Sequence, residues 1–144
     1  MVNDVYTGIA AELENCFDNP VVYFDSLPQG FKAPCFFINL VDSRLEPKLW
    51  NRYELVLDFD VMYYPDNPDE DNAIELHDVA YKLLFQLEYI TVLKNLLRGS
   101  DMHFEVQDNV LHFFITYKMM IFKELAKSPL MRQLIQSYKI KGVK

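Results

Sequence analysis

Residues 52–64 read RYELVLDFDVMYY, and two kinds of side chain alternate along their whole length. Large apolar groups occupy every second position, namely Tyr53, Leu55, Leu57, Phe59, Val61 and Tyr63. A period of two residues predicts a strand with one buried face. At ~3.3 Å per residue, 13 residues span roughly 40 Å, against a diameter of about 37 Å expected for a 144-residue chain. Part of this strand is therefore predicted to project as an arm.

The segments before this strand predict one helix and two further strands. Apolar residues recur at i, i+3, i+4 and i+7 over residues 2–17, which predicts an amphipathic helix. Short apolar runs predict strands at Val21–Phe24 and Cys35–Val41, with turn residues between them at 26–30. Residues 42–52 are interpreted as a loop outside the core.

The segments after the strand predict a second helix and a long hairpin. Asn67 suits an N-cap and Pro68 a first helical position, so a helix is predicted from there to about Leu87. Its apolar stripe, which should cover one face of the sheet, is Leu76, Ala80, Leu83, Leu84 and Leu87, with Val79 beside it.

Residues 88–97 give no clear pattern. Arg98-Gly99 then opens a hairpin, with its turn at Asp108-Asn109 and a return strand from Val110 to about Phe122. Residues 129–138 predict a short terminal helix with Leu130, Leu134 and Ile135 as its apolar patch.

The expected fold class is α+β, a mostly antiparallel sheet with long hairpins packed by an N-terminal and a central helix. The chain has 144 residues, 51% of them apolar, which suffices for the core of one domain. We expect a single domain over residues 1–127 and a basic tail or short helix over 128–144. Cys16 and Cys35 are too few for a disulfide framework and are interpreted as small core residues. No apolar stretch approaches the ~20 residues of a membrane span.

The net charge of −7 is unevenly distributed along the chain. Residues 1–117 hold 7 basic and 20 acidic groups, whereas residues 118–144 hold 7 basic groups and 1 acidic group. One interpretation is a solvated acidic surface with a soluble basic tail. The other is that the tail, including Lys139 and Lys141, lies on the acidic body of an identical neighbour, a head-to-tail contact that can close a ring.

Motifs for catalysis are absent from the sequence. There is no glycine-rich phosphate loop, no His-Glu-x-x-His and no nucleophile elbow. Asp58 and Asp60 share a strand face with Glu54, but an ion bound there would need ligands from elsewhere. The alternative is an acidic strip that faces solvent, a neighbouring subunit or a channel through which DNA passes without sticking.

A second cluster is predicted in the hairpin. A two-residue turn at Asp108-Asn109 places Glu105 opposite His112, with His103 on the same face. This composition would suit zinc, although a cross-strand hydrogen bond between Glu105 and His112 is the more ordinary outcome. Together with Asp58 and Asp60, these residues support the alternative function, a small metal-dependent or nucleic-acid-processing enzyme.

Trp50 is the remaining candidate of interest. It lies among Leu45, Pro47 and Leu49, so it is either an exposed anchor for a partner or a side chain that folds over the sheet edge. Arg44 and Arg52 flank it together with acidic residues, and this mixed charge does not resemble a nucleic-acid-binding patch.

Several motifs are similar to those of the tail terminator family of contractile phages and phage-like elements in Gram-positive bacteria. They are Val21-Val22-Tyr23-Phe24-Asp25, Gln29-Gly30-Phe31-Lys32, Pro34-Cys35-Phe36-Phe37-Ile38, Asn51-Arg52-Tyr53 leading to Tyr63-Tyr64-Pro65, Arg98-Gly99, Asp108-Asn109-Val110-Leu111-His112-Phe113 and Tyr117. The resemblance spans roughly residues 3–120 and continues weakly through Pro129-Leu130-Met131. Asn109 stands where the family pattern leads us to expect glycine, but asparagine also tolerates a positive φ.

The resemblance implies a structural virion protein and not an enzyme, with no cofactor. Such terminators form a ring, usually of six subunits, on the last layer of the tail tube, stop tube growth and offer a docking surface for the neck and head. The implied partners are further copies of the chain, the tail tube protein, and possible sheath and neck or connector proteins, with DNA passing through without specific binding and no membrane. The implied location is the virion tail, assembled in the bacterial host cytoplasm. A single-copy adaptor that joins two other proteins is a third hypothesis.

Contact residues are expected on three segments, the 42–52 loop, the 98–113 hairpin and the basic tail. The individual candidates are Arg44, Trp50, Arg52, Asp58, Asp60, Arg98, Lys139 and Lys141.

Overall fold

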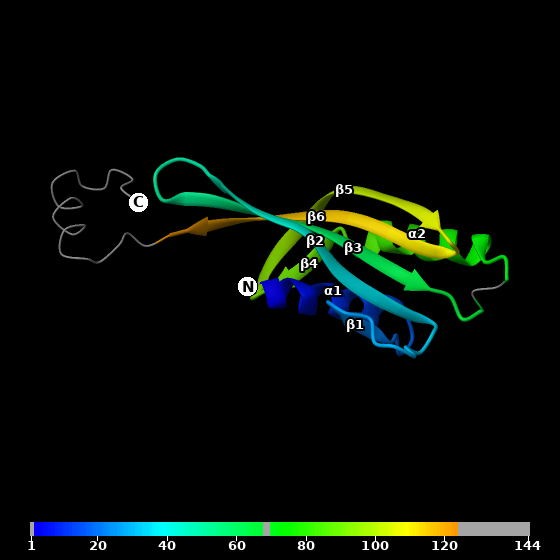
Figure 1. The fold of residues 1–144 in the computed structure, drawn as a ribbon. Coiled ribbons are helices and arrows are strands. Elements are labelled where there is room, and N and C mark those ends of the chain that lie inside the picture. Colours follow the sequence, from blue (N-terminus) through cyan, green and yellow to red (C-terminus); the bar gives the residue numbers. More distant parts are fainter. Residues whose placement is uncertain (1, 68–69, 124–144) are drawn as a thin grey trace, which may run out of the picture.

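The computed structural model describes residues 2–67 and 70–123. These residues form two helices and one curled six-stranded sheet (Figure 1), which confirms the α+β class. The elements are α1 (Val2–Cys16), β1 (Val22–Phe24), β2 (Cys35–Pro47), β3 (Arg52–Tyr64), α2 (Ala73–Gln86), β4 (Tyr89–Val92), β5 (Asn95–Gln107) and β6 (Val110–Phe122).

The strand order across the sheet is β1-β2-β3-β6-β5-β4. Only the β1–β2 pair is parallel, and the other described pairs are antiparallel. The segment that alternates most clearly in the sequence, β3, lies in the middle of the sheet between β2 and β6. Its pairing with β6 runs without interruption from Arg52 opposite Phe122 to Tyr63 opposite Leu111.

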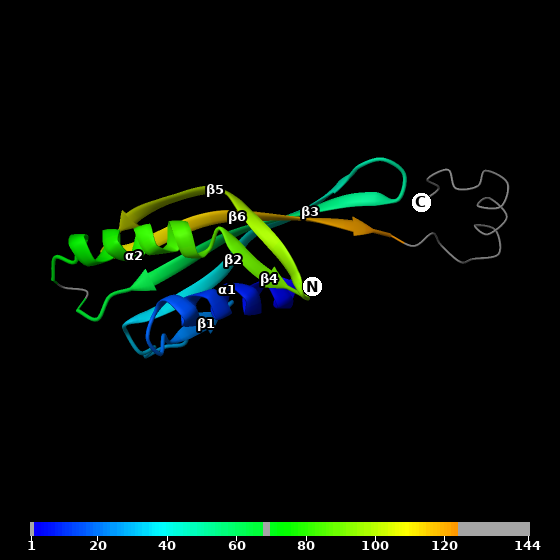
Figure 2. The same cartoon turned by 180° about the vertical axis from the view of Figure 1, so that it is seen from behind.

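Both helices lie on the same face of the sheet (Figures 1 and 2). Alternate residues of the central strands turn toward them because side chains of a strand point to opposite faces at successive positions. The resulting core comprises Val5, Ile9 and Leu13 from α1, Leu76, Val79, Ala80 and Leu83 from α2, and Leu57, Phe59, Val61, Leu111, Phe113, Ile115 and Tyr117 from the strands. The predicted apolar stripe of α2 is confirmed, with Leu84 at its half-buried margin.

The sheet curls around α1, so that this helix contacts strands near both sheet edges. Tyr6 packs edge-on against Phe24 of β1 at 5.4 Å and against Phe59 of β3 at 5.3 Å between ring centroids. On the other side, a β-carbon added at Gly8 would lie 2.8 Å from the carbonyl oxygen of Thr91 in β4. Glycine is needed at this position because a strand backbone occupies the space that a side chain would take.

The structure corrects several sequence-based boundaries. The central helix begins at Ala73 and not at Pro68, because the Asp71 carboxylate accepts a hydrogen bond from the Ala73 amide at 3.1 Å and the Asn72 side chain donates to the Asn67 and Glu70 carbonyls. The supposed loop at 42–52 is largely the end of β2, which extends to Pro47 because β3 supplies a full-length partner. A short strand, β4, was not predicted. The proposed terminal helix and tail lie outside the described residues.

Candidate functional site

A three-stranded arm extends beyond both helices (Figures 1 and 2). The arm comprises residues 41–56 of the β2–β3 hairpin and residues 118–123 at the end of β6. It begins where a bulge interrupts the β2–β3 register between Leu40 and Asp42. Bulges bend a strand and increase its twist, which accounts for the change of direction at this point.

The tip of the arm is an apolar surface. Leu49 is 79% exposed, Trp50 48% and Phe122 61%. The tip turn is closed by a hydrogen bond from the Lys48 amide to the Arg52 carbonyl at 2.8 Å, and Trp50 adopts a φ of 58° within it. The Arg52 guanidinium lies over the Phe122 ring at 5.8 Å. Large apolar side chains held together on a projecting hairpin are typical of a contact surface.

The arm also has two strand edges without a partner strand within residues 2–67 and 70–123. The pairing of β1 with β2 ends at Ile38, and the pairing of β5 with β6 ends at Tyr117. The outer backbone groups of β2 beyond Ile38 and of β6 beyond Tyr117 are therefore open. Exposed strand edges are templates for pairing with another chain.

Arg44 joins three carboxylates on the sheet face that points away from the helices. Its Nη1 atom lies 2.9 Å from Asp42 and 3.1 Å from Asp58, and its Nε atom lies 3.2 Å from Glu46. These hydrogen bonds raise the pKa of Arg44, with Glu46 contributing most. Asp58 also accepts a hydrogen bond from the Thr116 hydroxyl at 2.6 Å. Arg44 and Asp58 thus connect β2, β3 and β6 through their side chains at the base of the arm.

The predicted acidic strip is not a row of bare carboxylates. Lys48 lies 3.6 Å from Glu54, Arg44 pairs with Asp58, and His112 Nδ1 lies 2.9 Å from Asp60. Asp60 is moreover only 5% exposed, and its Oδ1 atom has no hydrogen-bond partner among the described residues. The expectation that Asp60 faces solvent is therefore wrong. Burial raises the pKa of the Asp60 carboxyl, and His112 offsets part of that effect.

Replacing Asp60 with asparagine is expected to stabilise the protein at pH 7 more than at pH 4. An aspartate whose pKa is raised by folding stabilises the folded protein most while it is protonated. This contribution is lost as the pH rises from the unfolded pKa of about 3.9 through the higher folded pKa. Asparagine keeps the neutral form at every pH. Chemical denaturation of both proteins at the two pH values measures the difference. The matched change Asp78→Asn, at an exposed site on α2, is the control for loss of one carboxylate, and equal effects of the two changes would contradict the role of burial.

The residues proposed for metal chemistry do not converge. Across the described chain, no three His, Cys, Asp or Glu side chains form a group suited to an ion. Glu105 lies opposite His112 as predicted, but His112 bonds to Asp60 on the other neighbouring strand, so the predicted Glu105–His112 hydrogen bond is wrong. His103 instead stacks on Phe114 with 4.9 Å between ring centroids.

Arg98 lies away from the arm, in β5. Its Nη2 atom is 3.0 Å from Glu88, and its guanidinium lies 5.6 Å from the centre of the Tyr89 ring. These contacts attach the start of β4 to β5. The structure thus brings Arg44, Trp50, Arg52 and Asp58 together on the arm or at its base, but it does not bring Arg98 to them. Lys139 and Lys141 lie outside the described residues.

A second apolar surface, missed in the sequence, runs along the outermost line of α2. Ile74 is 80% exposed, Tyr81 57% and Phe85 81%. The Tyr81 ring also contacts Phe104 of β5, with 5.8 Å between centroids. The spacing of seven and then four residues was visible in the sequence, but the stronger stripe on the opposite side of the helix concealed it. We call these three side chains, together with the neighbouring Asp78, the α2 outer face.

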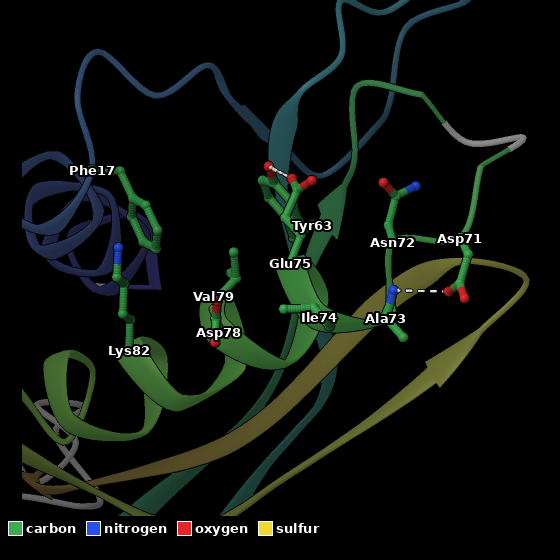
Figure 3. Close-up of a pocket in the computed structure, with 10 residues that line it drawn as sticks. All are labelled: Phe17, Tyr63, Asp71, Asn72, Ala73, Ile74, Glu75, Asp78, Val79 and Lys82. Atoms are coloured by element: carbon green, nitrogen blue, oxygen red, sulfur yellow. Dashed lines mark hydrogen bonds between the residues drawn. The ribbon is translucent and has the colours of Figure 1, made fainter.

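A pocket of about 640 Å³ lies beside this face, between the start of α2, β3 and the end of α1 (Figure 3). Asp71, Glu75 and Asp78 give its wall an acidic character. Glu75 accepts a hydrogen bond from the Tyr63 hydroxyl at 2.6 Å, and burial together with this carboxylate raises the pKa of Tyr63. Lys82 Nζ lies over the Phe17 ring at 5.4 Å.

Neither described helix is long and apolar enough to cross a membrane.

Comparison with known proteins gives a family for this architecture. A search of curated proteins found no match. A family model described as phage tail terminator protein matches residues 4–129, which covers α2, the whole sheet, the arm and all but the first two residues of α1. The match agrees with the resemblance of the aromatic and turn motifs, and the chain therefore belongs to the phage tail terminator protein family.

Proposed function

We propose that this chain assembles into a ring on the end of the tail tube, stops tube polymerisation and presents a docking surface for the neck and head. Membership in a structural tail family supports a role in the virion tail. The observation that carries the finer proposal is the arm, which extends an apolar tip and two open strand edges away from the helical layer. A monomer gains nothing from exposing such a surface, whereas an assembly buries it.

In this proposal the arm contacts the tail tube and neighbouring subunits. The open edges of β2 and β6 supply backbone donors and acceptors for strand pairing, and Leu49, Trp50 and Phe122 supply the apolar anchor. The face carrying Arg44 and Asp58 is rich in paired charges, and DNA passes such a ring without specific contacts.

Light scattering across protein concentration, alone and with the tail tube protein, tests the proposal. We expect a closed ring either in solution or only on tubes, and shorter tubes when the chain is present while tube protein polymerises. A persistent monomer that neither binds tubes nor shortens them would overturn the proposal.

Trp50→Asn is expected to weaken tube or ring binding without destabilising the fold. Loss of a central aromatic anchor costs about 2 kcal/mol of binding, or roughly thirtyfold in affinity. Asparagine suits the φ of 58° at this position better than tryptophan does, so stability should be unchanged or slightly higher. Binding and thermal unfolding are measured in parallel. Tyr89→Asn, at an aromatic of similar exposure on β4, is the matched control, and equal losses from both changes would count against an anchor at the tip.

A further inference from the structure

The α2 outer face has the composition of an interface. The outermost line of a surface helix is normally polar, yet here Ile74, Tyr81 and Phe85 are all more than half exposed. Three large apolar groups on one side of the helix, with Asp78 between the first two, indicate a surface that is covered in the working state. The arm does not cover it within one molecule, because the arm extends from the opposite end of the sheet (Figures 1 and 2).

The surroundings of this face are strongly acidic. Residues 66–86 carry six acidic groups and one basic group, Lys82. Lys82 lies over the Phe17 ring of α1. Glu70 and Asp78 are exposed, and Asp71 and Glu75 line the adjacent pocket. A partner for this face should therefore combine apolar groups with positive charge.

One segment of the same chain has that composition. Residues 124–144 contain five basic groups and one acidic group, with Leu130, Leu134 and Ile135 spaced for one face of a helix. Arg132 and Lys139 lie near this apolar series in the sequence. Apolar residues and net positive charge thus match the apolar line and net negative charge of α2.

The position of the segment indicates which copy it reaches. It follows Lys123, at the far end of the arm. The start of α2 lies at the other end of the sheet, where the Asn109 side chain donates to the Glu70 carbonyl at 2.8 Å. The strand β6 between these points has 13 residues, a separation of roughly 40 Å. A head-to-tail contact between neighbouring copies brings these two ends together.

We propose that residues 124–144 of one copy dock along the α2 outer face of a second copy. The inference deepens the proposed ring and rests on it for the arrangement of neighbours. Leu130, Leu134 and Ile135 cover Ile74, Tyr81 and Phe85, and the basic groups face Glu70 and Asp78. The contact is heterologous, because each copy contributes its segment at one end and its α2 at the other, and such contacts form a ring when the rotation between copies closes.

A labelled synthetic peptide of residues 124–144 tests the surface without requiring a ring. It is titrated by fluorescence anisotropy into full-length protein whose own segment carries Arg132→Glu, Lys139→Glu and Lys141→Glu. We expect saturable binding that weakens at least tenfold when Asp78→Lys and Phe85→Ser are added. Glu14→Lys, an exposed acid on α1, is the matched control and should leave binding unchanged. Equal binding to all these proteins would overturn the proposal.

A mixing experiment tests whether the contact joins two copies. One full-length variant carries Arg132→Glu and Lys139→Glu, and the other carries Glu70→Lys and Asp78→Lys. Each alone should lose ring or tube-end assembly, and an equimolar mixture should regain it, because acidic segments then meet basic helices and basic segments meet acidic helices. Failure of the mixture to regain assembly would overturn a contact between copies.

The two experiments separate this inference from the proposed function. If both variants assemble as the unaltered chain does, the docking proposal fails and the ring stands. If the unaltered chain never assembles, alone or on tubes, yet binds the peptide through α2, the ring fails and the docking surface stands.

Discussion

Tyr117→Ala is expected to lower the free energy of unfolding by roughly 3–5 kcal/mol, as observed when large aromatic side chains are removed from cores. The Tyr117 side chain is fully buried and contacts Phe59, with 6.2 Å between ring centroids. Its hydroxyl donates to the Leu87 carbonyl at 2.6 Å and so connects β6 to the residue that follows α2. Burial raises the pKa of Tyr117, so the hydroxyl keeps its proton throughout the working pH range.

Tyr117→Phe separates the two parts of this effect. Phenylalanine keeps the ring contacts but leaves the Leu87 carbonyl without its donor, a loss of about 1–3 kcal/mol for a buried group. Urea unfolding of both variants gives the two values. If Tyr117→Ala costs no more than Tyr117→Phe, the ring does not contribute to the core as its burial indicates.

Gly99→Val is expected to cost roughly 3 kcal/mol, the upper part of the range for overpacked cores. Gly99 pairs with Tyr117 inside β5. A β-carbon there would lie 2.4 Å from Cδ1 and 2.8 Å from Cγ1 of Ile115, and 3.1 Å from Cε1 of Tyr117. Ile115 is buried in the core, and the dense packing around it leaves it little room to move away.

A double-mutant cycle identifies the clash. Gly99→Ala is made in the natural chain and in an Ile115→Ala background, and unfolding free energies are compared. Because Ile115→Ala removes the two atoms in conflict, the cost of Gly99→Ala should fall by at least about 0.5 kcal/mol in that background. Additive effects would show that the strain at Gly99 has another source.

The sequence predicts elements best where alternation is strong and turns carry their usual residues. Strands β3 and β6 begin and end where predicted, and the Asp108-Asn109 turn has the two positive φ angles, 51° and 62°, of a tight hairpin. Strand β4 was not predicted because its turn to β5 lacks the usual turn residues. Leu93 and Lys94 have positive φ angles there, and neither position holds glycine or asparagine. Gly99 was predicted at the opening of a hairpin, but it lies within β5. Glycine is needed at this position because Ile115 occupies the space that a side chain would take.

The side-chain contacts of the candidate site depend on the order of the strands in the sheet, and local sequence patterns do not reveal that order. Arg44 reaches Asp58 only because the bulge between Leu40 and Asp42 shifts the register by one residue. His112 bonds to Asp60 because β6 lies next to β3, a pairing between segments about fifty residues apart. The exposed line of Ile74, Tyr81 and Phe85 was present in the sequence, but the longer apolar stripe on the opposite side of the helix predicted only the buried face.

The packing of α1 against β4 has a consequence for how the chain folds during synthesis. Helix α1 is made before β4, and Gly8 meets Thr91 only after more than eighty further residues have been added. Contacts between such distant segments slow folding, because the loop between them must close first. A nascent chain that ends before β4 leaves one side of α1 uncovered. Closure of the core therefore waits until β4 has been made, and α1 cannot complete its packing before that point.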